Sequence, residues 1–288
     1  MISELHSPIG FVLTATEPPG DGRTTAPLRA RTGRLGARLL GVLLPAAALL
    51  LVEGANRLGW VTSNLLPAPS DVVRALIELG WHTVALHVAA SALRVLAGYA
   101  IGAGLALAVG SLVGLSRTAR AVLDPSFQAL RAIPSLAWVP LLLLWLGIDE
   151  APKLAMIAIG AFFPVYMGVV AGIRGVDGKL VEVARLMRLS PFALVRRVLL
   201  PAALPSVFTG LRNGLSLAWM FMVAAELIAA TRGLGYLLTD GRETGRADLV
   251  LAAIVLLACL GKASDAAMAA VERRALAWRD AFGDGAAR

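Results

Sequence analysis

Long apolar stretches separated by short polar segments dominate the chain from about residue 37 onward. A helix that crosses the hydrocarbon core of a membrane needs about 20 mostly apolar residues. The stretches are rich in Leu, Ala, Val and Gly, and they lack the apolar–polar alternation of outer-membrane barrel strands. The pattern therefore predicts an all-α, polytopic membrane protein with about six transmembrane helices, at 37–57, 85–115, 122–147, 152–173, 203–230 and 247–270.

The basic residues between these stretches predict which way the helices face. If the N-terminus is cytoplasmic, eighteen of the 27 Lys and Arg residues fall on the cytoplasmic side and only six on the other side. Cytoplasmic loops of membrane proteins carry an excess of Lys and Arg. We therefore expect a cytoplasmic N-terminus, and we attribute the net charge of +8 to topology rather than to nucleic-acid binding.

Composition agrees with this prediction and divides the chain into segments. Of the 288 residues, 58% are hydrophobic and 16% charged, against about 25% charged in an average soluble protein, which excludes a disordered chain and disfavours a soluble enzyme. Residues 1–34, with Pro, Gly, Ser and Thr, are predicted to be a disordered cytoplasmic segment. The segment 35–84 would hold the first transmembrane helix and a periplasmic amphipathic stretch, 85–272 the main transmembrane domain, and 273–288 a cytoplasmic tail.

The sequence carries no recognisable motif for catalysis, metal binding or nucleotide binding. Gly261 and Lys262 are followed by Ala263 rather than by the Ser or Thr of a phosphate-binding loop. The three histidines show no metal-ligand spacing, no Ser/His/Asp set is suggested, and the single cysteine, Cys259, lies in the last predicted span. We therefore expect a transport subunit with no cofactor, and a membrane-embedded enzyme is the disfavoured alternative.

Four glycines recur at four-residue spacing within the predicted span 85–115. They are Gly98 and Gly102, then Gly110 and Gly114. Small residues at this spacing allow two helices to approach each other closely in lipid. Packing within the chain is the favoured interpretation, and a seam between two copies of the chain is the alternative.

The longest interior cytoplasmic loop, 178–205, is predicted to be helical. Residues 178–189 are rich in helix formers, Ser190 can cap a second short helix, and Pro191 suits the first position of that helix. Two short helices would form a rigid projection, with an apolar tip made by Leu186, Met187, Leu189 and Phe192. Such a tip suits a groove on a partner protein. The alternative is a helix pair that lies on the lipid surface.

This loop resembles the EAA motif, E-A-A-x3-G-x9-I-x-L-P, of the binding-protein-dependent ABC importer permeases. The matching residues are Glu182, Ala184, Leu200 and Pro201, with Val183 and Val198 at the positions of the middle alanine and the isoleucine. Arg188 stands where the family has a glycine, which suits the turn between the two helices. The resemblance extends over about 60–270 and includes LLPAPSDVVRAL, LRAIPSLAWVPLLLLWLGIDEAPK and AELIAATRGLGYLL. These segments are most similar to the aliphatic sulfonate permeases, within the group that also carries taurine and nitrate.

The resemblance implies the permease subunit of an ATP-driven importer in the bacterial inner membrane. It implies a core like the type I importer fold in 85–272, with coupling helices at 178–200 that dock into a separate ATP-binding subunit. It also implies a homodimeric pore in membrane lipid, and a periplasmic binding protein that delivers the substrate. The docking loop would comprise Glu182, Ala184, Leu186, Met187, Arg188, Leu189, Phe192, Leu200 and Pro201.

The same resemblance implies the direction of transport and the class of substrate. The expected substrate is a small organic anion, first of all an aliphatic sulfonate, which moves from the periplasm to the cytoplasm. Taurine, nitrate or another small solute is the alternative substrate for the same type of importer. A passive channel is an alternative of a different class, which would need no docking loop.

Four residues within the spans are candidates for the translocation path. Arg131 and Arg212 each lie about seven residues, or about 10 Å of helix, inside the cytoplasmic end of a span. Charges at that depth usually face the bundle interior or water, and a positive lining would suit an anion; snorkelling or structural pairing is the favoured alternative. Glu226 would repel an anion and is expected to be a buried hydrogen-bonding or gate residue. Trp138 could line the path, although packing or interface anchoring is the default for such a residue.

Overall fold

The computed structural model describes residues 34–62 and 65–278, and the regular structure in these residues is entirely helical. The longer helices are α1 (Arg34–Arg57), α3 (Trp81–Leu115), α4 (Arg117–Ala132), α6 (Glu150–Arg174), α9 (Leu200–Ala229) and α11 (Ala247–Ala275). The shorter helices are α2 (Pro69–Leu79), α5 (Val139–Leu146), α7 (Gly178–Leu186), α8 (Pro191–Leu194) and α10 (Leu234–Glu243), together with a 3₁₀ turn, η1 (Ser135–Trp138), and a π turn, η2 (Val195–Leu199). The predicted all-α fold class is confirmed. The predictions made for residues 1–33 and 279–288 lie outside the described residues.

Four helical segments are long and apolar enough to cross a membrane. Within the described residues they are Trp81–Leu115, Glu150–Arg174, Pro191–Ile228 and Ala247–Ala275, and the bent pair Arg117–Ala132 and Ser135–Leu146 would make a fifth if it crosses as one span. Each of the four overlaps one of the predicted spans. Helix α1 covers the predicted span 37–57, but the side chains of residues 34–42 lie outside the described residues. The total of six spans and the segment boundaries at 34, 84 and 272 therefore stay predictions.

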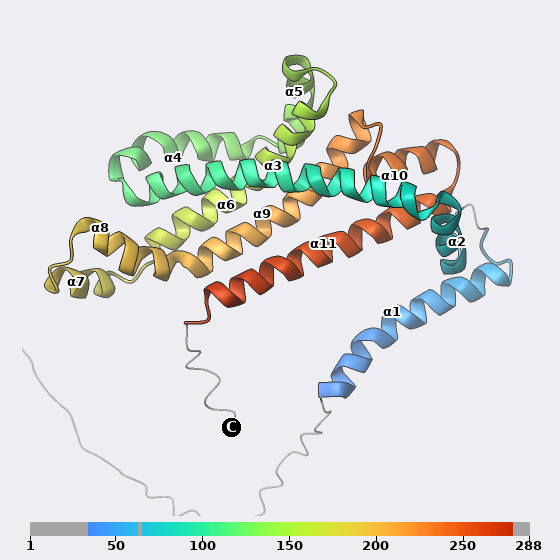
Figure 1. Ribbon diagram of the computed structural model, residues 1–288, viewed down its shortest axis with the longest axis horizontal. Helices are drawn as coiled ribbons and strands as arrows, with labels where there is room; N and C mark the ends of the chain where they lie inside the picture. The colour runs from blue at the N-terminus through green and yellow to red at the C-terminus, as the bar shows by residue number, and fades with distance from the viewer. Residues whose placement is uncertain (1–33, 63–64, 279–288) are drawn as a thin grey trace, which may run out of the picture. The chain divides into compact units, whose positions relative to one another are not determined.

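The predicted span 122–147 is broken into two helical segments rather than formed by one straight helix. Helix α4 ends at Ala132, and its axis makes an angle of 90° with that of the η1–α5 segment, Ser135–Leu146. The cause is Pro134, which disfavours helical backbone at the residue before it, so that Ile133 is extended with φ −76° and ψ 123°. Figure 1 shows α5 turned away from the direction of α4. The apolar residues of 122–147 are therefore divided between two helical segments that run in different directions.

Small residues allow α6 to pack directly against α3. The four regularly spaced glycines of α3, Gly98, Gly102, Gly110 and Gly114, all face α6 of the same chain. A Cβ atom added to Gly98 would lie 2.6 Å from the Cβ atom of Ile157, and one added to Gly110 would lie 3.0 Å from the Cβ atom of Val169. Larger side chains at these positions would push the two helices apart.

Helix α6 packs just as closely against α9 on its other side. A Cβ atom on Gly168 would lie 2.7 Å from the Cα atom of Gly210, so the two backbones are nearly in contact there. The core residues around this crossing include Val165, Tyr166 and Ala203, which are almost fully buried. The helices α3, α6 and α9 therefore form one tightly packed core, with α6 in its centre.

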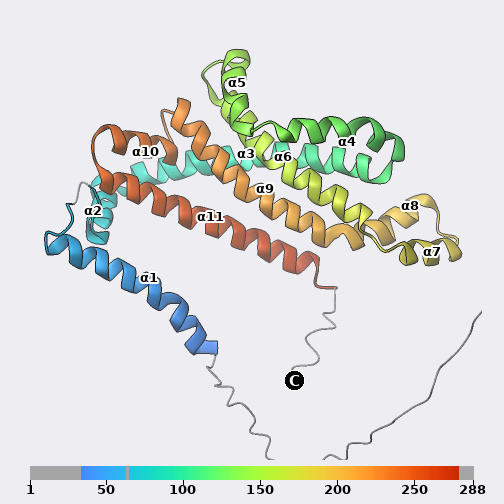
Figure 2. The ribbon, with the colours of Figure 1, turned by 180° about the vertical axis from the view of Figure 1, so that it is seen from behind.

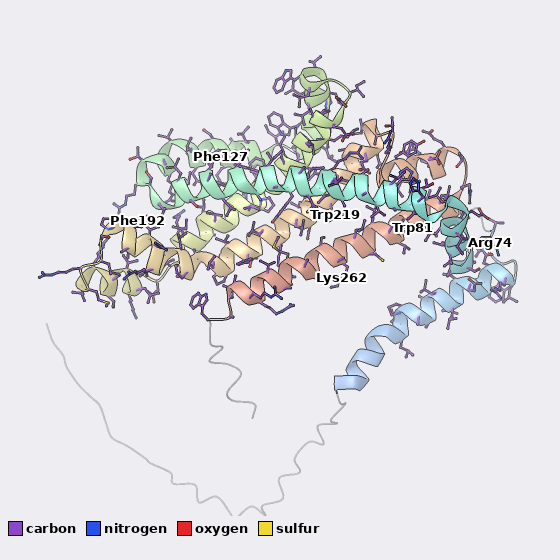
Figure 3. All side chains as sticks on the ribbon, viewed as in Figure 1. Arg74, Trp81, Phe127, Phe192, Trp219 and Lys262 are labelled. Carbon is purple, nitrogen blue, oxygen red and sulfur yellow. The ribbon has the colours of Figure 1, made fainter. Side chains whose placement is uncertain are left out.

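The two ends of this core carry different short helices. Figures 1 and 2 show α3, α6, α9 and α11 running lengthwise, with α7 and α8 at one end and α2 and α10 at the other. We call these the coupling end and the α10 end. In Figure 3, Phe192 lies at the coupling end and Trp81 at the α10 end.

Candidate functional site

The coupling segment, residues 178–200, begins with two capped short helices. The side chain of Asp177 caps α7 by accepting a hydrogen bond from the backbone N–H two residues on, at 2.9 Å. The hydroxyl of Ser190 caps α8 by accepting one from the N–H three residues on, at 3.3 Å, and Pro191 occupies the first position of α8. Through η2, α8 continues into α9. Helix α8 is therefore an extension of the long helix α9, and α7 is joined to it by a turn.

The turn between α7 and α8 places an arginine in a conformation that glycine prefers. Arg188 has φ +53° and is the only non-glycine residue with a positive φ in the described part of the chain. Its N–H donates to the carbonyl of Arg185 at 2.9 Å, and the N–H of Leu189 donates to the carbonyl of Ala184 at 3.2 Å. This pair of bonds closes a helix in the Schellman motif, whose left-handed residue is usually glycine. The turn therefore keeps the geometry of a glycine turn, at a cost of about 1–2 kcal/mol for the left-handed arginine.

The tip of the coupling segment exposes large apolar side chains. Leu186, Met187 and Phe192 are 83%, 70% and 74% exposed, and we call these three residues the apolar tip. Leu189, which the sequence also suggests for the tip, is half-buried, and Ala184 of the motif is buried. Glu182 is exposed on α7, while Leu200 and Pro201 form the start of α9. The tip thus offers an apolar surface that nothing in the described part of the chain covers.

A cavity of about 670 Å³ lies along α6 and α9, beside the break between α4 and η1. We call it the groove. Its polar lining residues are Arg131, Ser135, Ser206, Thr209 and Asn213, and its apolar ones include Phe163, Met167, Met220 and Phe221. No Asp or Glu lines the groove in the described part of the chain. Arg131 is exposed and has no carboxylate partner among the described residues. The groove is therefore a mostly apolar wall with one positive charge.

Helix α9 carries a polar stripe next to the apolar wall of the groove. Ser206, Thr209, Asn213 and Ser216 recur every three or four residues and are all exposed, so they share one face of the helix. Thr209 and Ser216 donate to the carbonyls of their own helix, at 3.0 and 3.1 Å. We did not select these residues from the sequence. Their signal was the helical spacing of polar residues within a predicted span.

The other path candidates, Trp138 and Arg212, lie outside the groove. Trp138 is half-buried in a neighbouring apolar cavity of about 270 Å³ between α3, α4 and α6. The guanidinium of Arg212 points to α11, where Nε donates to Asp265 Oδ1 at 3.0 Å and Nη1 to Glu272 Oε2 at 3.2 Å. Of the four candidates, the groove is lined by Arg131 alone.

Glu226 is the centre of a buried polar cluster at the α10 end. Its side chain has no solvent exposure, and both of its oxygens accept from Ser91 Oγ at 2.9 Å. It also accepts from Arg94 Nη1 at 2.7 Å and from the backbone N–H of Gly235 at 2.8 Å. Ser91 Oγ in turn accepts from the N–H of Leu234 at 2.8 Å. The carboxylate therefore ties the start of α10 to α3 and α9.

Arg94 extends this cluster to α6. Its Nε and Nη2 atoms donate to the two carboxylate oxygens of Glu150 at 2.6 and 2.7 Å, and Nη1 also donates to the carbonyl of Arg232 at 2.6 Å. Lys153, which is almost fully buried, donates to Glu150 at 3.0 Å. We did not select Arg94 as a site residue, although it is one of three arginines within the predicted spans. It joins α3 to the start of α6, to the last turns of α9 and to the loop before α10, away from the groove.

Comparisons with known proteins place this geometry in context. The family model of the binding-protein-dependent transport system inner membrane component matches residues 100–276. The aliphatic sulfonates transport permease protein SsuC of Bacillus subtilis (strain 168) is 41% identical over 243 residues, which cover 84% of this chain and 88% of SsuC. The taurine transport system permease protein TauC of Escherichia coli (strain K12) is 36% identical over 224 residues, which cover 76% of this chain and 82% of TauC.

A solved structure shares the fold. A chain of the MetNI methionine ABC transporter, in an inward-facing conformation, aligns with a TM-score of 0.59 and 23% identity, over 69% of this chain and 98% of that chain. The predicted core, like that of the type I importer permeases, is therefore confirmed.

Proposed function

The chain belongs to the family of binding-protein-dependent transport system inner membrane components, and we propose that two copies of it form the pore of an importer for aliphatic sulfonates. As a family member it is a multi-pass inner membrane permease and a transport subunit rather than an enzyme. Membership also implies an ATPase subunit and a substrate-binding protein as partners. The homodimer, the cytoplasmic N-terminus and the substrate are our proposals.

The polar stripe of α9 supports a second copy facing the groove. Helix α9 is part of a membrane-spanning segment, and polar side chains within such segments usually face a protein interior or a water-filled cavity. Asn213 is the residue of the stripe that would be most costly to expose to lipid. Its carboxamide carries two N–H donors and an acceptor oxygen, whereas a serine or threonine hydroxyl has a single donor that can bond to a carbonyl of its own helix. We therefore place the stripe toward the partner copy and a hydrated path between the two grooves.

Arg131 carries the proposal that the cargo is an anion. It contributes a positive charge to a groove without acidic lining residues in the described part of the chain, and the second copy would contribute another. A sulfonate is fully ionised at neutral pH and offers three oxygen acceptors for a guanidinium. SsuC is named for aliphatic sulfonates and TauC for taurine, which also carries a sulfonate group. The sulfonate group is thus the chemistry that these two relatives share.

Uptake measurements test the substrate and the role of Arg131. Cells that lack the gene should fail to grow on an alkanesulfonate as the sole sulfur source, and the intact gene should restore growth. Arg131→Ala should lower sulfonate uptake about tenfold or more, the loss expected when one hydrogen bond to a charged group is removed. Arg120→Ala, on the same helix, is the control and should leave uptake unchanged. Normal sulfonate growth without the gene, together with a loss of taurine or nitrate use, would replace sulfonate by that solute.

The exposed apolar tip carries the proposal that the coupling segment docks into the ATPase subunit. Three large side chains on two short capped helices, between the predicted spans 152–173 and 203–230, match the requirements of a helix that inserts into a groove. A movement of the ATPase subunits would then displace α7 and α8, and the continuous α8–η2–α9 segment would carry that displacement into the wall of the groove. The positive charges of Arg185 and Arg188 would border the contact.

Co-purification tests the docking contact directly. Phe192→Ser should weaken the retention of the ATPase subunit on the tagged permease, and Glu182→Lys should either do the same or uncouple ATP hydrolysis from uptake. Val122→Ser is the matched control, because Val122 is also apolar and 65% exposed but lies on α4. Full retention and uptake in both variants of the coupling segment would refute the docking assignment.

A further inference from the structure

Helix α2 is an 11-residue helix that lies across the direction of the membrane-spanning helices. It is joined to α3 by Gly80 alone, whose φ of +79° permits the sharp change of direction. An 11-residue helix is about 16 Å long and too short to cross a bilayer. Since α3 and α11 cross the membrane along their own length, a helix that lies across their ends runs parallel to the membrane surface.

The polar side of α2 faces a cavity within the protein. Asp71, Arg74 and Glu78 line a cavity of about 320 Å³ together with the start of α11. Across this cavity, Glu78 accepts a hydrogen bond from Arg246 at 3.0 Å. The small side chain of Ala75, on the same side of the helix, is 1% exposed. Charged residues therefore hold α2 to the rest of the chain on this side.

The opposite side of α2 is apolar and exposed. Val73 and Ile77, one helical turn apart, are 57% and 73% exposed, and Trp81 at the first position of α3 is 83% exposed. The exposed apolar surface continues down α3 with Leu86 and Leu93. A soluble helix would turn its largest aliphatic residues inward, so this arrangement needs an apolar surrounding. Figure 3 shows Arg74 and Trp81 at this end of the molecule.

We propose that α2 is an interfacial helix that lies in one leaflet of the membrane at the α10 end, with Val73 and Ile77 in the acyl-chain boundary and Trp81 at the level of the headgroups. Three observations favour lipid as the surrounding of this surface: the orientation of α2, its length, and the continuity of its apolar side with the exposed apolar side of the spanning helix α3. Tryptophan is enriched at this depth in membrane proteins, and helices of this composition bind in the plane of the interface. The helix would fix the depth of α3 and α11 in the bilayer. This inference rests on the membrane-spanning helices and not on the identity of the substrate.

Spin-label accessibility tests the position of α2 in the reconstituted full transporter. Cys259, which is exposed, is first replaced by alanine, and single cysteines are then introduced by Ile77→Cys or, as the matched control, by Glu78→Cys. The two positions are adjacent on α2 and are both exposed, but they lie on its apolar and polar sides. Oxygen partitions into lipid, whereas a nickel chelate stays in water. We expect the label at 77 to collide more with oxygen than with nickel, and the label at 78 to show the reverse.

Other results would overturn the proposal. A label at 77 that collides mainly with the nickel chelate would place this side of α2 in water. A label at 77 that is shielded from both reagents only after addition of the binding protein would assign the surface to that protein. Shielding from both reagents in the absence of the binding protein would assign it to a second copy of the chain. Since no arm of the experiment contains a transported solute, its outcome is independent of the sulfonate proposal.

Discussion

Replacing Glu226 by glutamine should destabilise the α10 end more than the same replacement at an exposed glutamate on α10. Glutamine has nearly the same shape but offers one acceptor oxygen and an NH₂ group in place of two acceptor oxygens. The carboxylate accepts from Arg94, from Ser91 and from the N–H of Gly235. Whichever way the amide is turned, its NH₂ group meets at least one of these donors. A donor is then left without an acceptor, and the buried guanidinium of Arg94 loses one of its two counter-charges.

The magnitude follows from the burial of the pair. Removing one partner of a buried ion pair costs about 3–5 kcal/mol. The side chains of Arg94 and Glu226 are 10% and 0% exposed, so screening by water is small. Arg94 keeps its two bonds to Glu150, so we expect the lower end of this range, about 3 kcal/mol. The control is Glu243→Gln on α10. The side chain of Glu243 is 68% exposed, and its Oε1 atom lies 4.0 Å from Nη2 of Arg242, which is a long and weak ion pair. Replacing it should change the free energy of unfolding by no more than about 0.5 kcal/mol.

Two measurements check this reasoning. Unfolding of the purified protein in mixed micelles with increasing SDS gives the free energy of unfolding for each variant. Hydrogen exchange at the amides of Leu234 and Gly235, which donate to Ser91 and Glu226, reports on the cluster itself. We expect Glu226→Gln to lower the free energy of unfolding and to lose protection at both amides. Equal free energies for the two variants, with both amides still protected, would refute the assignment of Glu226 to the fixing of α10.

Three further substitutions probe other parts of the chain. Arg188→Gly should stabilise the turn of the coupling segment by about 1 kcal/mol, seen as roughly fivefold slower exchange at the amide of Leu189; faster exchange would contradict a strained left-handed arginine. Gly102→Ala should cost about 1–3 kcal/mol in the same micelle assay, because the added Cβ atom would overlap Ala158 of α6. Gly104→Ala, which meets nothing within 4 Å, should be neutral or slightly stabilising, and an equal loss in both would refute close α3–α6 packing. Arg212→Ala should lower stability only slightly, because its ion pairs with Asp265 and Glu272 are partly exposed to solvent, and it should leave sulfonate uptake close to normal. An uptake loss as large as that of Arg131→Ala would show that Arg212 also belongs to the translocation path.

The sequence predicts the spanning helices well because their signal is local. Each of α3, α6 and α11 is a long, mostly apolar helix with few charged residues in its most apolar stretch, and hydropathy alone identifies it. The capping residues of the coupling segment are also local signals. Ser190 and Pro191 indicate the start of a helix whatever surrounds them, and α8 begins where they predict.

The bend between α4 and α5 was missed because hydropathy does not register direction. The stretch 122–147 is apolar enough for a span, and the sum of its hydropathy values is the same whether the helix is straight or bent. The signal was nevertheless present in the dipeptide Ile133–Pro134, since a residue before proline is driven out of the helical region. The break also determines the lining of the groove, because Arg131 and Ser135 on either side of it both line the groove.

The sequence does not predict the partners of the three arginines within the predicted spans, Arg94, Arg131 and Arg212. Hydropathy gives the depth of a charge in the membrane, but the side of the helix on which its partner lies depends on packing. Arg94 finds Glu226 at a separation of 132 residues, and Arg212 finds Asp265 at a separation of 53. A buried charge needs a counter-charge or water, so two of the three arginines are accounted for by ion pairs within the chain. Arg131 has no such partner among the described residues, and it lines the groove. Its charge is therefore left to water, to the proposed second copy or to the transported anion, and this is the physical reason why we propose Arg131, rather than Arg94 or Arg212, as the arginine that meets the substrate.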